Sequence, residues 1–187
     1  MQQFLSGFEF AFSYLISLSY FDHFLILFLF GIVFQFKDLK NILSLFLAIC
    51  IGTIAGFLLA IFKVTFFSIA TIKLATAFAF LTVGVHHIIS NSLSANAIRY
   101  NFFAAIGLVT GTGICFHYVK GFGRSIQFLH TSGYGLGILA AYFLISLAGL
   151  LISSLIIVVF KTDRRSFNLG ISGIGIGIAL VLIYMRY

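Results

Sequence analysis

The chain has 187 residues, of which 61% are hydrophobic and 8% charged, and its formal net charge is +7. A soluble domain carries about 25% charged residues, so the eleven basic and four acidic side chains could not cover the surface of a soluble fold. The mean hydropathy of +1.18 agrees, and together these values exclude a water-soluble enzyme and indicate an integral membrane protein.

The apolar runs have the length that crosses a bilayer. A hydrocarbon core about 30 Å thick needs roughly 20 apolar residues in a helix, so the runs predict an all-α fold, a polytopic transmembrane helical bundle. We expect an N-terminal helix over 4–19, which either forms a seventh span or lies partly in the interface. No linker divides the chain, so a single integral membrane domain over 1–187 is expected. The six expected spanning helices cover 22–36, 42–62, 65–90, 100–118, 138–160 and 168–185.

Two stretches of the chain are more polar than their surroundings. The run 90–94 closes the helix expected over 65–90. Residues 126–137 are rich in glycine and polar side chains, and irregular backbone there would need burial among other helices. We therefore expect the spanning helix in this region to begin only at residue 138.

Basic residues fall singly or in small groups between the apolar runs. This distribution is typical of short loops that face anionic headgroups, so nucleic acid is not expected as a partner. The loops after the helices over 22–36, 65–90 and 138–160 carry six Lys and Arg residues, against four in the opposite loops and termini. The bias places the first set of loops in the cytoplasm and Tyr187 outside.

Glycines recur at a spacing of four residues. Glycines four apart share one helix face and let another backbone approach closely. Four such pairs predict a tightly packed helical bundle. A glycine face could also pack against a helix of another subunit. The pairs are Gly52 and Gly56, Gly107 and Gly111, Gly133 and Gly137, and Gly173 and Gly177.

Charged residues at membrane depth are costly and are functional candidates. Asp22 and His23 interrupt the first apolar stretch. The carboxylate either caps the start of a helix or, with the imidazole, binds a metal or relays a proton. Lys73 lies inside the run 65–90, where its ammonium either snorkels to the nearer interface or pairs with Asp22 or Glu9.

The other residues capable of metal or acid–base chemistry have simpler explanations. Cys50 and Cys115 lie inside apolar runs without zinc-ligand spacing and are expected to be small buried hydrophobes. No nucleophile elbow or zinc-protease motif occurs, so neither an enzyme nor a cofactor is expected. The remaining histidines lie near the ends of apolar runs and suit the membrane interface; they are His86, His87, His117 and His130.

Two segments carry a family resemblance. Residues 20–29 read YFDHFLILFL, and residues 106–114 read IGLVTGTGI. The first is similar to the Asp-His-Leu-Leu-Phe-Leu signature, and the second to the Phe-Gly-Leu-x-His-Gly-x-Gly-Phe signature, of the HupE/UreJ family of bacterial membrane proteins. The order and spacing of the other segments fit from about residue 9 to the loop over 161–165. The resemblance implies nickel or cobalt uptake, with histidines and acids inside the helices handling the metal.

The chain departs from the family pattern where that metal chemistry is implied. Of the implied ligand set, Asp22 and His23 remain. The family's other histidines and acids are replaced, and one acid becomes a lysine, which would repel a cation. The replaced positions fall within 13–16 and at Thr53, Lys73, Thr110 and Gly135.

Two hypotheses follow from this pattern. We expect a HupE/UreJ-like scaffold that no longer transports metal and serves as a structural or accessory subunit of a larger bacterial inner-membrane complex. Its partners would be the lipid bilayer and other membrane-protein subunits. The alternative is a nickel or cobalt permease with a rearranged site, in which Asp22 and His23 are joined by His86, His87 or His130. A metal ion is a partner only under this alternative.

Overall fold

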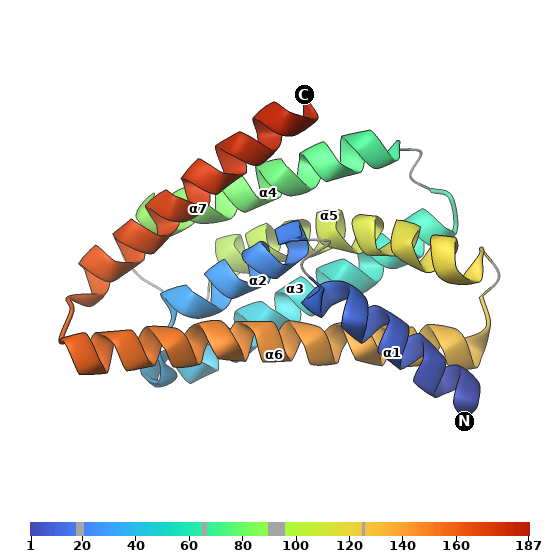
Figure 1. Ribbon diagram of the computed structural model, residues 1–187, viewed down its shortest axis with the longest axis horizontal. Helices are drawn as coiled ribbons and strands as arrows, with labels where there is room; N and C mark the ends of the chain where they lie inside the picture. Colours follow the sequence, from blue (N-terminus) through green and yellow to red (C-terminus); the bar gives the residue numbers. More distant parts are fainter. Residues whose placement is uncertain (18–20, 65–66, 90–95, 125) are drawn as a thin grey trace.

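The computed structural model describes residues 1–17, 21–64, 67–89, 96–124 and 126–187, and all the regular secondary structure in them is helical (Figure 1). This confirms the predicted all-α class. The polar run 90–94, expected to close a helix, lies outside the described residues. The helices are α1 (Gln2–Ile16), α2 (Phe21–Val33), the short 3-10 helix η2 (Phe36–Asp38), α3 (Leu39–Ile61), α4 (Ile69–Ile89), α5 (Ala97–Phe122), α6 (Phe128–Phe160) and α7 (Arg164–Arg186).

Five helices in the described part of the chain are long and apolar enough to cross a membrane, namely α3 with η2, α4, α5, α6 and α7. The chain is therefore a multi-pass membrane protein. The helix expected over 22–36 is shorter than predicted, because α2 ends at Val33 and has 13 residues. At 1.5 Å per residue it is about 20 Å long, too short to cross alone. Counted with α1 as one broken span, it raises the number of crossings to six.

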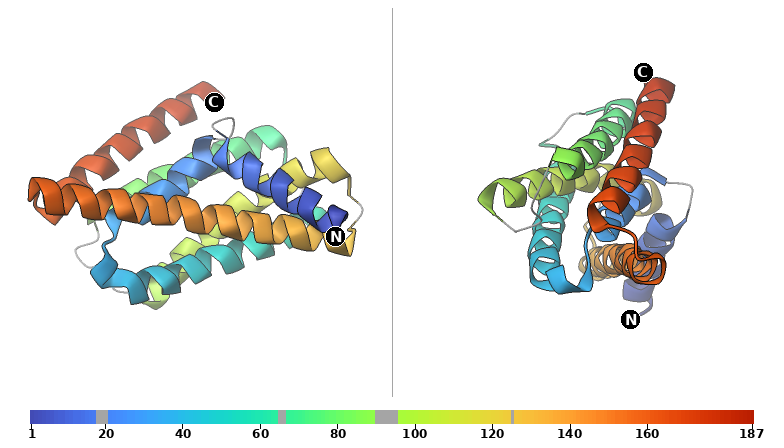
Figure 2. Two further views of the ribbon diagram at one scale, coloured as in Figure 1. Left: turned by 60° about the horizontal axis from the view of Figure 1, so that its bottom comes forward. Right: turned by 90° about the vertical axis from the view of Figure 1, so that its left-hand side faces the viewer.

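The two N-terminal helices follow one another along α6. The axes of α1 and α2 differ in direction by 76°. A Cβ added at Gly133 of α6 would lie 2.1 Å from the carbonyl oxygen of Phe4, and one added at Gly31 of α2 would lie 2.0 Å from that of Ser146. In Figures 1 and 2, α1 lies along the first part of α6, and α2 lies along a later part. Both helices run in the same direction as α6. Together they have the course of one interrupted span.

Helix α6 is continuous over 33 residues and includes the segment 128–137 that was expected to be irregular. The expectation fails because α1 covers this segment. A Cβ at Gly137 would lie 2.5 Å from the carbonyl oxygen of Phe8. Helix α1 can approach this closely because Gly133 and Gly137 carry no side chain, so the segment packs against α1 as a regular helix.

Helices α3 and α5 pack in parallel through reciprocal glycine pairs. A Cβ at Gly52 would lie 2.0 Å from the carbonyl oxygen of Ala104, and one at Gly111 would lie 2.1 Å from that of Thr53. Gly56 and Gly107 make equally close approaches, to Leu108 and Ile49. This contact, with α1, α2 and α6, surrounds the larger hydrophobic core.

Helix α7 packs antiparallel to α4 at the outer edge of the bundle (Figure 1). Gly175 faces inward, where an added Cβ would lie 3.1 Å from Leu29 of α2. Gly173 and Gly177 face away from the rest of the chain, and nothing lies within 4 Å of a Cβ added at either. The fourth glycine pair thus differs from the other three, because it makes no packing contact within the described chain.

Candidate functional site

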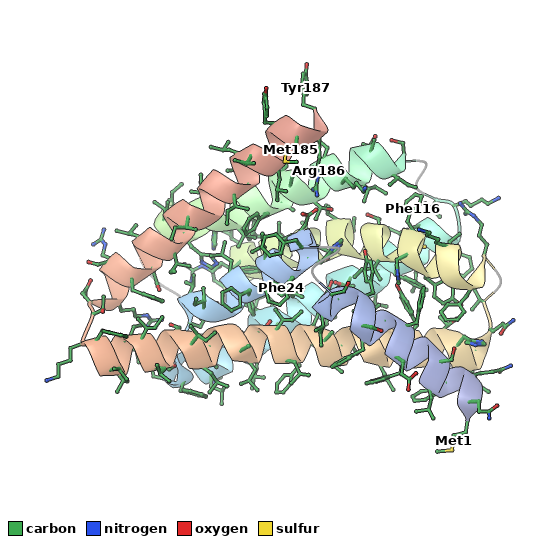
Figure 3. All side chains as sticks on the ribbon, in the orientation of Figure 1. Met1, Phe24, Phe116, Met185, Arg186 and Tyr187 are labelled. Atoms are coloured by element: carbon green, nitrogen blue, oxygen red, sulfur yellow. The ribbon has the colours of Figure 1, made fainter. Side chains whose placement is uncertain are left out.

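The carboxylate of Asp22 is held in an ion pair with Arg186. Asp22 lies buried in the first turn of α2, and Arg186 lies in the last turn of α7 (labelled in Figure 3). The same Arg186 nitrogen donates a hydrogen bond of 2.9 Å to the backbone carbonyl of Lys73. The acid is thereby neutralised within the chain, and one guanidinium joins α7 to both α2 and α4.

Lys73 is therefore not the partner of Asp22. Helix α4 begins at Ile69, so Lys73 lies in its second turn with an exposed side chain. Sequence reasoning missed Arg186 as the partner, because the helix expected over 168–185 ends one residue before it. The sequence signal for this partner was an arginine at the end of an apolar helix. The aliphatic part of an arginine side chain can lie along a neighbouring helix while its guanidinium reaches a charged group.

His23 is buried between α2 and α5. Its Nε2 lies 3.3 Å from the backbone carbonyl oxygen of Thr110. A carbonyl oxygen only accepts, so this bond requires the proton on Nε2. A Cβ added at Gly113 would lie 3.2 Å from the same Nε2, so the absence of a side chain there makes room for the imidazole ring. The ring nitrogen nearest to α5 is thus occupied by a backbone contact.

Three buried hydroxyl groups meet beside this histidine; we refer to Thr53, Thr110 and Tyr142 as the hydroxyl cluster. The Thr53 hydroxyl donates to the Tyr142 hydroxyl at 3.3 Å, and the Tyr142 hydroxyl donates to that of Thr110 at 3.3 Å. The Thr110 hydroxyl donates to the carbonyl of Gly107 at 2.9 Å. Each proton has an acceptor, so the cluster satisfies its own hydrogen bonds without an ion.

Two members of the hydroxyl cluster, Thr53 and Thr110, lie at positions that the family resemblance implies as ligands. His23, Thr53 and Thr110 come from α2, α3 and α5 and meet in the core. Two of the three carry a hydroxyl in place of an imidazole. Another implied position, Gly135, lines a pocket of about 170 Å³ between α3 and α6, at which Thr53 also lies. The structure thus brings His23, Thr53 and Thr110 close together, and of these three only His23 has a side chain of the kind that binds nickel or cobalt.

A second polar group lies one to two turns further along α5. The Nδ1 of His117 lies 3.2 Å from the hydroxyl of Tyr134, which itself donates to the carbonyl of Ile114 at 3.0 Å. The ring of Tyr14 stacks on His117 with a centroid distance of 3.6 Å. Sequence reasoning missed the tyrosines. The signal was present in the spacing of Tyr134 and Tyr142, eight residues apart and hence on one helix face.

The other histidines do not join Asp22 and His23. His86 and His87 lie at the opposite end of α4 from Lys73, about 20 Å along the helix axis at 1.5 Å per residue. His130 is on the first turn of α6, where its ring pairs with the side chain of Gln127. Among the described residues, no group of three or more His, Cys, Asp or Glu side chains could hold a metal ion.

No family model, characterised protein or solved structure matches this chain.

Proposed function

We propose that the protein is a HupE/UreJ-like, non-transporting subunit of a larger assembly in the bacterial inner membrane, without enzymatic activity of its own. The observation that carries the proposal is the state of the implied metal positions. The Asp22 carboxylate is paired with Arg186, and the Thr53 and Thr110 hydroxyls are bonded to the hydroxyl of Tyr142 and, for Thr110, to the backbone carbonyl of Gly107. Nickel and cobalt require several imidazole, carboxylate or thiolate ligands at once.

The outer face of α7 supports a docking role. Gly170, Gly173 and Gly177 lie three and four residues apart, which places them on one face, and none has an atom within 4 Å of an added Cβ. Only 17% of the apolar stretch of α7 is buried inside the bundle. Small residues on a lipid-facing stripe let a helix of another subunit approach closely. The proposed partner is therefore a transmembrane helix that packs on this glycine face.

The docking role is tested by mild purification in nanodiscs from the native membrane. We expect a partner in stoichiometric amount with the wild type, and its loss with Gly173→Leu/Gly177→Leu. Gly135→Leu is the matched control, because Gly135 also has open space around it but lies on α6. A wild-type chain that purifies alone would contradict the proposal, as would equal partner loss in both variants.

Metal analysis of the same preparations tests the permease alternative. We expect neither nickel nor cobalt at stoichiometric level after equilibration with each ion. Bound metal that disappears in Asp22→Ala would favour a permease with a rearranged site and overturn the non-transporting assignment.

A further inference from the structure

A pocket of about 220 Å³ opens between the C-terminal ends of α3 and α5; we refer to it as the basic pocket. Its walls are apolar and its mouth carries two cations. Phe116, labelled in Figure 3, belongs to the α5 wall. The lining residues are Ala60, Lys63, Phe67, Cys115, Phe116, Val119 and Arg124.

The two cations have no acidic partner in the part of the chain that the structure describes. Lys63 follows the end of α3 and Arg124 follows the end of α5, and both side chains are exposed. Asp22 and Asp38, two of the chain's four acids, are paired with Arg186 and Arg164 elsewhere. The other two acids lie on α1 and at the start of α7, neither of which lines the pocket. An anion that neutralises the pair must therefore come from outside the chain.

The walls continue from the charged mouth toward the interior of the bundle. Ala60 and Cys115 are buried, and Phe116 and Val119 are half-buried. A free inorganic anion would meet only apolar surface below the cations. A molecule with an anionic group and a hydrocarbon chain would satisfy both parts of the pocket.

The size of the pocket limits how much of such a molecule it can enclose. The 220 Å³ volume lies below the range of about 300–1,000 Å³ typical of pockets that enclose drug-sized ligands. It suits a headgroup with the first carbons of an acyl chain. The rest of the acyl chain would lie along the lipid-facing surfaces of α3 and α5.

We propose that the basic pocket binds one anionic phospholipid, with its phosphate between Lys63 and Arg124 and the start of an acyl chain against Phe116 and Val119. The site is separate from the glycine face of α7 and does not depend on the proposed subunit role. The negative ends of the α3 and α5 helix dipoles favour cations at both positions. They therefore help to hold the two side chains where the phosphate binds.

Native mass spectrometry of the full chain in detergent tests this site, with dioleoylphosphatidylglycerol and dioleoylphosphatidylcholine as probes. We expect one tightly retained phosphatidylglycerol and at least about tenfold weaker binding in Lys63→Asn/Arg124→Gln, since each cation near the headgroup contributes to the attraction. Asparagine is chosen because Lys63 has a φ of 57°, which asparagine tolerates. The matched control, Lys40→Gln/Lys161→Asn, removes two charges at the other end of the bundle and includes Lys161, whose φ is 50°.

A second variant, Ala60→Leu, fills the pocket and leaves both cations in place. It therefore still tests lipid binding in the basic pocket if the double variant fails to fold. We expect it to weaken phosphatidylglycerol binding while circular dichroism stays unchanged. Equal retention of phosphatidylcholine, or equal loss in the control variant, would overturn the proposal. Displacement of the lipid by millimolar inorganic phosphate would also overturn it, because the site would then bind a free anion.

Discussion

At the residue scale, the buried carboxylate of Asp22 is neutralised by an ion pair with Arg186. Asp22 and Arg186 retain side-chain exposures of 11% and 21%, so the pair is largely removed from water. Removing one partner of such a pair leaves an uncompensated charge, whereas removing both leaves none. The two cases can therefore be separated by experiment.

We predict that Arg186→Gln lowers the free energy of unfolding by about 3 kcal/mol, toward the lower end for broken buried pairs because some exposure remains. The double variant Asp22→Asn/Arg186→Gln should lose less, because no charge is left unpaired. Circular dichroism during titration with dodecyl sulfate measures both. A double variant less stable than Arg186→Gln would show that most of the loss in free energy of unfolding comes from losing the ion pair itself, and not from the unpaired carboxylate.

A second prediction concerns the cap of α7. The hydrogen bond from the Ser166 backbone N–H lowers the pKa of Asp163 below its ordinary value of 3.8. A depressed folded-state pKa means that the carboxylate stabilises the first turn of α7 above pH 3.8 and that this contribution is lost as the pH falls through the lowered value. We expect the NMR shifts of Ser166 and Phe167 in nanodiscs to be constant from pH 5 to 8 and to change only in stronger acid.

Asp163→Asn is the control for this cap. Asparagine also caps helices but does not titrate, so the acid transition of Ser166 should disappear while the first turn of α7 remains helical. A transition that persists in this variant would assign the pH response to another group.

At the element scale, glycines with the same spacing have different roles. Gly52 has a carbonyl oxygen 2.0 Å from where a Cβ would be, whereas Gly173 has open space. Neither has a positive φ, so their difference lies in packing and not in backbone conformation. The helical spacing is identical in the two pairs, and only the neighbouring helix distinguishes them.

We predict that Gly52→Ala lowers the free energy of unfolding by about 1–3 kcal/mol through overpacking against α5. Gly173→Ala should leave stability unchanged or raise it by about 0.5–1 kcal/mol, because alanine is the better helix former. The same dodecyl sulfate titration compares the two purified variants. Similar losses in both would indicate that the glycine face of α7 is already covered, for example in a homodimer.

At the scale of the whole molecule, the course of the first two helices decides the topology. Helices α1 and α2 together run in the direction of α6 and begin at the same end of the bundle (Figure 1). If the pair forms one broken span, the chain crosses the membrane six times and both termini lie on one side. A re-entrant pair would leave the N-terminus on the opposite side from Tyr187.

We predict that both termini react with a membrane-impermeant maleimide from the same side. Single cysteines at Gln3, Thr162 and Tyr187, in a Cys50→Ala/Cys115→Ala background, test this in intact cells. The charge bias of the loops leads us to expect labelling from outside at Gln3 and Tyr187 and protection at Thr162. Opposite labelling of Gln3 and Tyr187 would show that α1 and α2 do not cross.

The amino-acid sequence alone determined the class of the protein and most of its helices. Lipid cannot hydrogen-bond to the backbone, so long apolar runs have to be helices, and glycines four apart have to share a face. Only the tertiary structure decided which distant residues meet. The pairing of Asp22 with Arg186, the contact of His23 with Thr110 and the continuity of α6 each depend on a neighbouring helix from elsewhere in the chain. The helical period within one segment carries no information about that neighbour, and so the open face of Gly173 and Gly177 could not be distinguished from the three buried glycine pairs.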